Sequence, residues 1–418
     1  MKITELNARE ILDSKGTPTL EAEVTLENGI KALGQVPSGA STGANEALEL
    51  RDKDQSRYQG KGVLKAIENI KSPIKQALIG EDADNQAKID QILIDLDGTK
   101  NKEKLGANAI LGVSMAICRA SARSQKIPLF EYFGQLSGNR QFELPQPLIL
   151  VLEGGEHGDW STDIQEYFVI PKKQAFPTFA ERLRAGSEIF HTLQKVLAAK
   201  KYAVGVGLEG AFMPKEIQSN EEAFQLIIEA IEKSGYKIPE QIILGIDAAS
   251  SEFYETGKYH LQSEDLTLSA DEWQEKIEGW IAKYPIWSLE DMFAEDDWKS
   301  WQKFTQKVGS DHQVVGDDLL VTNVERIKRA IAEKSVTSVL IKLNQIGTVT
   351  ETISAIKLSH SAGFTTVISH RSGETNDDMI ADLCVGSGSW QCKFGGPDRG
   401  ERVAKYNRLL RIEEKLKI

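Results

Sequence analysis

The chain has 418 residues, of which 40% are hydrophobic and 27% charged, and a formal net charge of −12 at pH 7. This length exceeds one ordinary domain, so we expect one small and one large domain. The acidic charge argues against a nucleic-acid-binding protein and against one that binds anionic membrane surfaces. The chain has no apolar signal stretch at its start and no run of about eighteen apolar residues, so we expect a cytoplasmic protein.

The first forty residues predict β-strands. Apolar and polar residues alternate from 20 to 26, and Asn28-Gly29 is typical of a hairpin turn leading into a second strand at 30–36. The loop that follows, residues 37–43, is rich in Gly, Ser and Ala. Such a loop is mobile enough to close over a bound substrate as a lid, although an ordinary surface turn has the same composition.

The pattern is helical from about residue 62 to 124 and includes a strongly apolar helix near 107–122, which contains Cys118. The other two cysteines, Cys384 and Cys392, also lie in apolar segments, so all three are expected to be reduced core residues. A polar connection follows near 137–141. We therefore predict a small α+β domain at residues 1–138 and a larger domain at residues 139–418.

The larger domain repeats one pattern, a short apolar strand-like run that ends in an ionisable residue. Helical segments near 179–199, 221–234, 270–283 and 324–333 separate such runs. This alternation predicts an α/β barrel of the TIM type, in which the downstream ends of the strands share one rim. The residues expected at that rim are Asp247, Glu290, Asp317, Lys342, His370 and Lys393.

Residues 205–210 match the dinucleotide-binding pattern G-x-G-x-x-G. The pattern requires a helix at its third glycine, but Pro214 would interrupt the first turns of that helix. A carboxylate inside the turn, Glu209, would also repel a pyrophosphate. We therefore favour a tight turn that directs Glu209 into a site.

Three of the rim residues, Asp247, Glu290 and Asp317, are carboxylates that would repel one another unless a cation neutralised them. Oxygen ligands suit a hard divalent ion. The alternative is that each acid caps the helix that follows it. In the pairs Glu290-Asp291 and Asp317-Asp318, strand alternation favours the first residue as the one that points inward.

Lys342, Arg371 and Lys393 add positive charge to the same rim. Burial and mutual repulsion would depress the pKa of a lysine there towards neutrality, and a neutral lysine is a general base. Guanidinium and hydroxyl donors on Arg371 and Ser372, with Ser38, suit a phosphate.

At these positions the chain resembles the enolases, the phosphopyruvate hydratases of glycolysis, over nearly its whole length. The motifs that carry the resemblance are Ser38 to Gly43, Ala107 to Ser114, Gln165-Glu166, Ala294 to Trp298, Lys342 to Gly347, Ser369 to Thr375 and Arg402 to Asn407. The resemblance implies the reversible dehydration of 2-phosphoglycerate to phosphoenolpyruvate. It implies two Mg²⁺ ions, the second of which arrives with the substrate.

The resemblance also implies a role for each site residue. Lys342 resembles the family's general base, which removes the proton next to the substrate carboxylate, and Glu209 resembles the acid that protonates the departing hydroxyl. Residues beside that acid in the family are matched by Glu166, His157 and His370. Asp247, Glu290 and Asp317 match the ligands of the first Mg²⁺, and Ser38 matches the attachment point of the second. The expected substrate contacts are Lys393 for the carboxylate, Arg371 and Ser372 for the phosphate, and Gln165.

Family members are usually dimers or larger, and Glu21 and Arg411 match positions that pair between subunits. An exposed surface pair of little energetic worth is an equally good reading of these two residues. We expect a homodimer or a higher homo-oligomer.

Several positions depart from the family pattern. Leu208 stands where the family has aspartate before the acid, and Glu153 stands where it has asparagine. Further departures are Trp160, Ala211, Met292 and, in the expected surroundings of Lys393, Trp390, Cys392, Phe394 and Gly396. These changes leave open a lyase for a different phosphorylated hydroxy acid, and a non-catalytic binding protein of the same fold.

Overall fold

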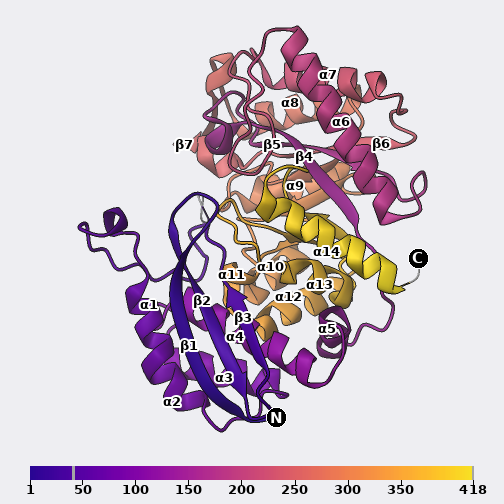
Figure 1. Ribbon diagram of the computed structural model, residues 1–418. Helices are drawn as coiled ribbons and strands as arrows, with labels where there is room; N and C mark the ends of the chain where they lie inside the picture. Colours follow the sequence, from indigo (N-terminus) through magenta and orange to yellow (C-terminus); the bar gives the residue numbers. More distant parts are fainter. Residues whose placement is uncertain (40–42, 417–418) are drawn as a thin grey trace.

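The computed structural model describes residues 1–39 and 43–416. It places a small α+β domain against a larger domain built on a closed eight-stranded barrel, as predicted (Figure 1). Residues 40–42 of the predicted lid lie outside the described residues, so the lid stays a prediction. The exact boundary after residue 138 also stays a prediction.

The small domain is built on an antiparallel sheet of β1 (Ile3–Leu12), β2 (Pro18–Leu26) and β3 (Lys31–Gln35). Its hairpin turns at Asn28-Gly29, as the sequence predicts, with Gly29 in the left-handed region at φ 81°. Helix α4 (Ala107–Ser124) packs on this sheet. A Cβ on Gly34 would lie 2.3 Å from the carbonyl oxygen of Gly112, so the close packing of α4 depends on glycine in β3.

The helical stretch before α4 is broken into short pieces. It consists of α1 (Leu64–Asn69), a π-helical turn (Ile70–Ile74), α2 (Lys75–Leu78) and α3 (Gln86–Asp97). Pro73 lies inside the π-helical turn. Proline has no N–H to donate and its ring crowds the preceding turn, which accounts for the local change of helical geometry. Helix α5 (Leu129–Ser137) ends at Gly138, which adopts φ 83°.

The strands of the barrel neighbour one another in the closed order β10-β11-β12-β13-β14-β4-β5-β6. All neighbours are parallel except at β5, which runs antiparallel to both β4 and β6. Their bounds are β4 (Gln146–Glu153), β5 (Glu166–Pro171), β6 (Ile242–Asp247), β10 (Ile286–Glu290), β11 (Gln313–Gly316), β12 (Ser338–Ile341), β13 (Thr365–Ser369) and β14 (Gln391–Lys393).

The reversal of β5 decides which residues meet at the rim. Because β5 runs the other way, its first residue, Glu166, lies where its neighbours end. Glu166 pairs in register with Glu153 at the end of β4 and with Asp247 at the end of β6. One antiparallel strand thus adds a carboxylate to the rim.

Helices cover the outside of the barrel (Figure 1). The helices predicted from sequence occur as α6 (Phe179–Ala199), α7 (Asn220–Lys233), α8 (Ala270–Lys283) and α10 (Val324–Glu333). Capping boxes at Thr178 and Ser269 start α6 and α8. The other α-helices and strands of the described residues are α9 (Trp298–Val308), α11 (Leu343–Ile346), α12 (Val349–Ser361), α13 (Met379–Ser387), α14 (Gly400–Leu416) and a small sheet of β7 (Tyr254–Glu255), β8 (Lys258–Leu261) and β9 (Leu266–Leu268).

Within the described residues, no helix has both the length and the apolar character needed to cross a membrane. The three cysteines are buried and free, as predicted.

A buried carboxylate, Asp90 of α3, joins the two domains. It accepts hydrogen bonds from the Ser114 hydroxyl of α4 at 2.6 Å and from the Thr350 amide and hydroxyl of α12 at 2.8 and 2.6 Å. Burial raises the pKa of Asp90 while these donors oppose that shift. The cluster fixes α12, and with it β12 and Lys342, against the small domain.

Replacing Asp90 with alanine leaves the donors of the buried Ser114 and the half-buried Thr350 without this acceptor. We expect Asp90→Ala to lower the free energy of unfolding by about 2 kcal/mol or more. Urea denaturation monitored by circular dichroism measures the loss. The control is Asp95→Ala on the exposed side of the same helix, which should change stability by less than about 0.5 kcal/mol. Equal stability of the two variants would contradict the structural role of Asp90.

Candidate active site

A cavity opens among the strand ends at one rim of the barrel. The space left in it is only about 20 Å³ for the centre of a water-sized sphere, which is room for a water or an ion. Most of the residues singled out from sequence line it: His157, Gln165, Glu166, Glu209, Asp247, Asp317, Lys342, His370, Arg371, Ser372 and Lys393. Glu290 contacts this set through Lys393, and Ser38 lies beside it on the small domain.

Lys393, at the end of β14, has its ammonium group among three buried carboxylates. Its Nζ donates to Asp247 Oδ2 and Glu290 Oε1, both at 2.7 Å, and lies 3.2 Å from Glu166 Oε1. Burial acts to lower the pKa of Lys393, but these carboxylates outweigh it and hold the pKa well above its ordinary value. Lys393 is therefore protonated and carries a positive charge at the centre of the rim.

Lys342, directly after β12, donates to Asp317 Oδ2 at 2.5 Å. Burial acts to lower its pKa, but the Asp317 carboxylate outweighs burial and raises the pKa above the ordinary value. The pKa near neutrality that the sequence argument predicts is therefore wrong for this arrangement. The Asp317 carboxylate, a direct partner of Lys342, outweighs the cations of Arg371 and Lys393 nearby.

The carboxylates of this rim suit a divalent cation for two reasons. They offer oxygen ligands, and they outnumber the positively charged side chains beside them. Glu290 Oε2 is buried and has no hydrogen-bond partner within residues 1–39 and 43–416. Burial and the neighbouring Asp247 raise the pKa of Glu290 well above its ordinary value. A bound divalent ion would relieve this excess of buried negative charge.

The three predicted metal ligands, Asp247, Glu290 and Asp317, are not grouped around a common position in the structure. Among the described residues, two groups of three bring possible ligand atoms within 4.8 Å of one another: Asp291, Asp317 and Asp318, and His157, Glu166 and Glu209. Asp247 and Glu290 instead meet through the Lys393 ammonium. An ion held by Asp247, Glu290 and Asp317 therefore requires Lys393 to move aside.

The second acid of each predicted pair, Asp291 and Asp318, also lines the cavity. The Asp291 carboxylate accepts the backbone N–H groups of Asp317 and Asp318, both at 2.9 Å. Burial and Asp318 raise the pKa of Asp291 well above its ordinary value. Asp291 thus orients the loop that carries Asp317, a role that alternation along one strand could not reveal.

On the other side of the cavity Glu209 lies between two histidines. His370 Nε2 is 3.1 Å from Glu209 Oε2, and His157 Nδ1 is 3.6 Å from Glu209 Oε1. Neither ring nitrogen of His157 has a hydrogen-bond partner among the described residues. Burial lowers the pKa of His157 and lowers that of His370 to about 3, so both rings are neutral at pH 7.

Arg402 of α14 sets the tautomer of His370. Its Nη1 lies 2.7 Å from His370 Nδ1, and a guanidinium can only donate. The single proton of the neutral ring is therefore on Nε2, facing Glu209. Burial acts to raise the pKa of Glu209, but His370 and His157 outweigh it and hold the pKa well below its usual range.

Residues 205–211 form a tight turn, and no helix lies between this turn and the start of α7 at Asn220. The Gly207 amide donates to the Ala211 carbonyl at 2.8 Å, and Gly210 adopts φ 85°. This geometry turns Glu209 into the cavity, as the sequence predicts, and does not have the helix of a dinucleotide-binding fold.

Arg371 and Ser372 follow β13 and line the cavity. The Arg371 guanidinium donates to both carboxylate oxygens of Glu46, at 2.9 and 3.2 Å, and to Asn344. Ser38 exchanges backbone hydrogen bonds with Gly373, and its hydroxyl donates to Asp13 at 2.7 Å. The small domain thus supplies an anion, Glu46, where the sequence predicts a phosphate contact.

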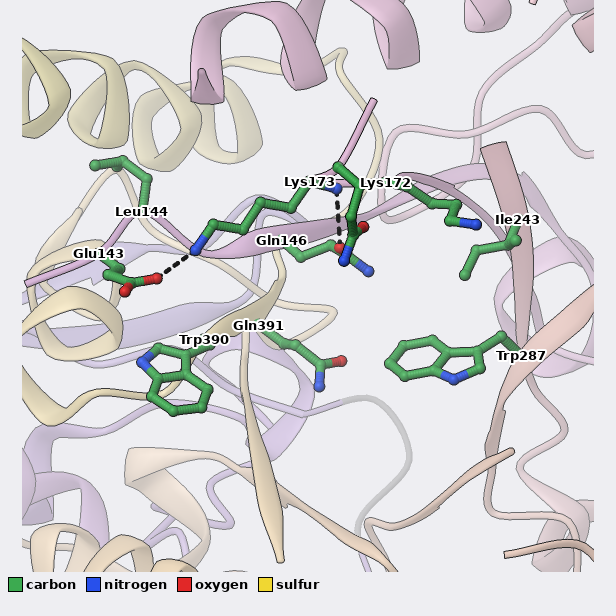
Figure 2. Close-up of a pocket in the computed structure, with 10 residues that line it drawn as sticks. Glu143, Leu144, Gln146, Lys172, Lys173, Ile243, Trp287, Trp390 and Gln391 are labelled. Atoms are coloured by element: carbon green, nitrogen blue, oxygen red, sulfur yellow. Dashed lines mark hydrogen bonds and ion pairs between the residues drawn. The ribbon is translucent and has the colours of Figure 1, made fainter. Parts of the chain in front are cut away.

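A second cavity, of about 650 Å³, is lined by Gln146, Trp287 and Gln391 at the starts of β4, β10 and β14, so it lies at the opposite end of the barrel. Trp287 and Trp390 flank Gln391 in its wall, and Lys173 extends above it towards Glu143 (Figure 2). Trp390 precedes the short strand β14 and is 61% exposed. The prediction that Trp390 belongs to the surroundings of Lys393 is therefore wrong, because β14 separates the two residues along the barrel axis.

Of the two predicted subunit contacts, Glu21 and Arg411, only Glu21 has side-chain partners among the described residues of the same chain. Glu21 pairs with Arg9 and accepts from Gln35 Nε2 at 2.7 Å. Arg411 is exposed on α14. A contact between subunits stays a prediction.

Matches to two protein-family models agree with this architecture. Residues 3–133 match the family described as Enolase, N-terminal domain. Residues 141–417 match the family described as Enolase, C-terminal TIM barrel domain. Together the matches span nearly the whole chain, and the protein belongs to the enolase family.

Proposed function

We propose that the protein is an enolase, a hydro-lyase that interconverts 2-phosphoglycerate and phosphoenolpyruvate. The observation that carries the proposal is the separation of two proton-transfer groups within one cavity. Lys342 follows β12, and Glu209 packs over the end of β4, with β13 and β14 between them around the barrel. A base and an acid on different sides of a substrate are what a β-elimination of water requires.

The proton to be removed lies next to a carboxylate and is barely acidic, since its loss creates a dianion. Lys393 would place a positive charge at those carboxylate oxygens as the negative charge develops. Asp247, Glu290 and Asp317 would hold one Mg²⁺ and Ser38 the second. When bound, these ions supply the electrostatic stabilisation of the dianion.

Lys342 would take the proton. In the described arrangement it is held as an ammonium group by Asp317. It becomes a base only after it leaves that carboxylate. The short Lys342–Asp317 contact is therefore the one that substrate and metal must replace.

Glu209 would give a proton to the departing hydroxyl, or take one from water in the hydration direction. Without substrate the carboxyl is ionised and faces the N–H of His370. An anionic substrate beside it would raise its pKa and favour the protonated form. His157, Glu166 and Gln165 line the space around it, and Gln165 Oε1 is buried with no partner among the described residues.

Arg371 and Ser372 would bind the phosphate, with Arg371 exchanging Glu46 for the substrate. We further expect the enzyme to act in the cytoplasm, in glycolysis and gluconeogenesis, as a homodimer or higher homo-oligomer. The changed side chains Leu208 and Glu153 near the acid favour one other candidate, a lyase for a related phosphorylated hydroxy acid. A panel of such acids in the same assay separates the two functions.

The first test is turnover of 2-phosphoglycerate with Mg²⁺, measured by the ultraviolet absorbance of the enol phosphate. Lys342→Ala removes the base, so we expect kcat to fall about a hundred-fold or more. Lys328→Ala, an exposed lysine on α10, should keep the wild-type rate. Absence of turnover by the wild type at high enzyme and Mg²⁺ concentrations would rule out the proposed function.

The second test concerns the metal and needs no turnover. We expect isothermal titration of Mg²⁺ in the presence of 2-phosphoglycerate to show binding that Asp317→Asn weakens about ten-fold or more, because a charged ligand is lost. Asp311→Asn, an exposed acid on the loop before β11, serves as the control. The same Mg²⁺ affinity in both variants would exclude Asp317 as a ligand.

A further inference from the structure

The turn that carries Glu209 forms few backbone hydrogen bonds within itself. Its internal hydrogen bond is from Gly207 N–H to the Ala211 carbonyl at 2.8 Å, and the contact from Gly210 N–H to the Gly207 carbonyl is long at 3.4 Å. The amides of Glu209 and Ala211 are buried and need acceptors from elsewhere.

Glu153 supplies those acceptors. Its Oε1 accepts the N–H of Ala211 at 2.8 Å and that of Glu209 at 3.0 Å, and Oε2 lies 3.2 Å from the same Glu209 nitrogen. Its own backbone N–H donates to the carbonyl of Phe212 at 2.8 Å. The last residue of β4 is thus bonded to the turn through both its side chain and its backbone.

The carbonyl groups of the turn are held from the other side. Arg399 Nη1 donates to Gly207 O at 3.1 Å, and Arg402 Nη2 donates to Leu208 O at 3.0 Å. The Gly396 amide donates to Glu209 O at 2.8 Å. The turn is therefore clamped between a carboxyl group and two guanidinium groups, and Arg402 is also the partner of His370.

The carboxyl of Glu153 fits its place closely. The side chain is fully buried, and a Cβ on Gly207 would lie 2.3 Å from Glu153 Oε2. The charged groups that act on it are Glu209 and Arg402. Burial and Glu209 raise the pKa of Glu153 to about 8, so it is mostly a neutral acid at pH 7 and its acceptor oxygens matter more than its charge.

We propose that Glu153 is a positioning residue for Glu209, holding the turn that directs this carboxyl at the substrate. The enolase pattern has aspartate at the position of Leu208 and asparagine at that of Glu153. In this chain Leu208 is apolar, and the additional acidic side chain is Glu153 at the end of β4. Glu153 lies outside the turn and accepts hydrogen bonds from its backbone. The inference rests on the proposed function, because Glu209 is the acid only if the reaction is the proposed dehydration.

The first experiment follows hydrogen exchange of the peptide that contains residues 207–212 and needs no activity. Glu153→Leu removes the acceptors at similar size, so we expect this peptide to exchange at least about ten-fold faster than in the wild type. Glu153→Gln retains an acceptor oxygen and no charge, so it should retain most of the protection. The matched control is Glu413→Gln, since Glu413 is also a buried carboxylate that accepts two backbone N–H groups, at the start of α6. Unchanged exchange in Glu153→Leu would overturn the proposal.

The second experiment measures the rate of dehydration. Glu153 does not line the cavity, so we expect Glu153→Leu to lower kcat about ten- to a hundred-fold while KM and the Mg²⁺ affinity change less than about three-fold. Glu153→Gln should restore most of kcat, whereas a structural role alone would not separate kcat from KM. Equal kcat in the Leu variant and the wild type would refute the positioning role.

Gly207→Ala provides a second route if Glu153→Leu does not fold. Its methyl group would push the Glu153 carboxyl away from the turn while leaving the residue in place. We expect the same loss of protection and of kcat, and wild-type values would again refute the proposal. If the wild type has no turnover at all, the proposed function fails, and the exchange experiment still decides whether Glu153 holds the turn.

Discussion

The buried ammonium group of Lys393 is the interaction on which the rim of the barrel depends. It comes from β14 and binds Asp247 of β6 and Glu290 of β10, with Glu166 of β5 close by. Carboxylates buried without a cation would lose their hydration and repel one another. Because one lysine meets acids from three other strands, it allows an acidic cluster to exist inside a folded barrel.

The same cluster explains why the strand reversal matters to chemistry. In an all-parallel barrel, the first residue of β5 would lie at the far end. Its antiparallel course brings Glu166 to the rim, in register with Glu153 and Asp247. Three acidic positions then follow one another across β4, β5 and β6: Glu153 binds the turn of Glu209, whereas Glu166 and Asp247 both lie at the Lys393 ammonium group.

Much of the fold, and the presence of several ionisable residues at the barrel rim, could be predicted from sequence, because the strand pattern follows a local rule. Apolar runs that end in a charge identify strand ends, and capping residues such as Thr178 and Ser269 mark helix starts. What could not be predicted depends on partners distant in sequence. The raised pKa of Lys342 comes from Asp317, and the role of Glu153 comes from a turn more than fifty residues later. Trp390 comes directly before the three-residue strand β14, which places it at the other end of the barrel from Lys393.

The pairing of Arg371 with Glu46 has a consequence for ligand selection. An anion that enters this site meets an arginine already satisfied by an internal carboxylate. Binding is then an exchange of one anion for another, and only the difference between the two pairs contributes to affinity. A singly charged anion would gain little by that exchange, whereas a doubly charged anion would gain more. The acidic side chain from the small domain would thus disfavour weaker anions at Arg371.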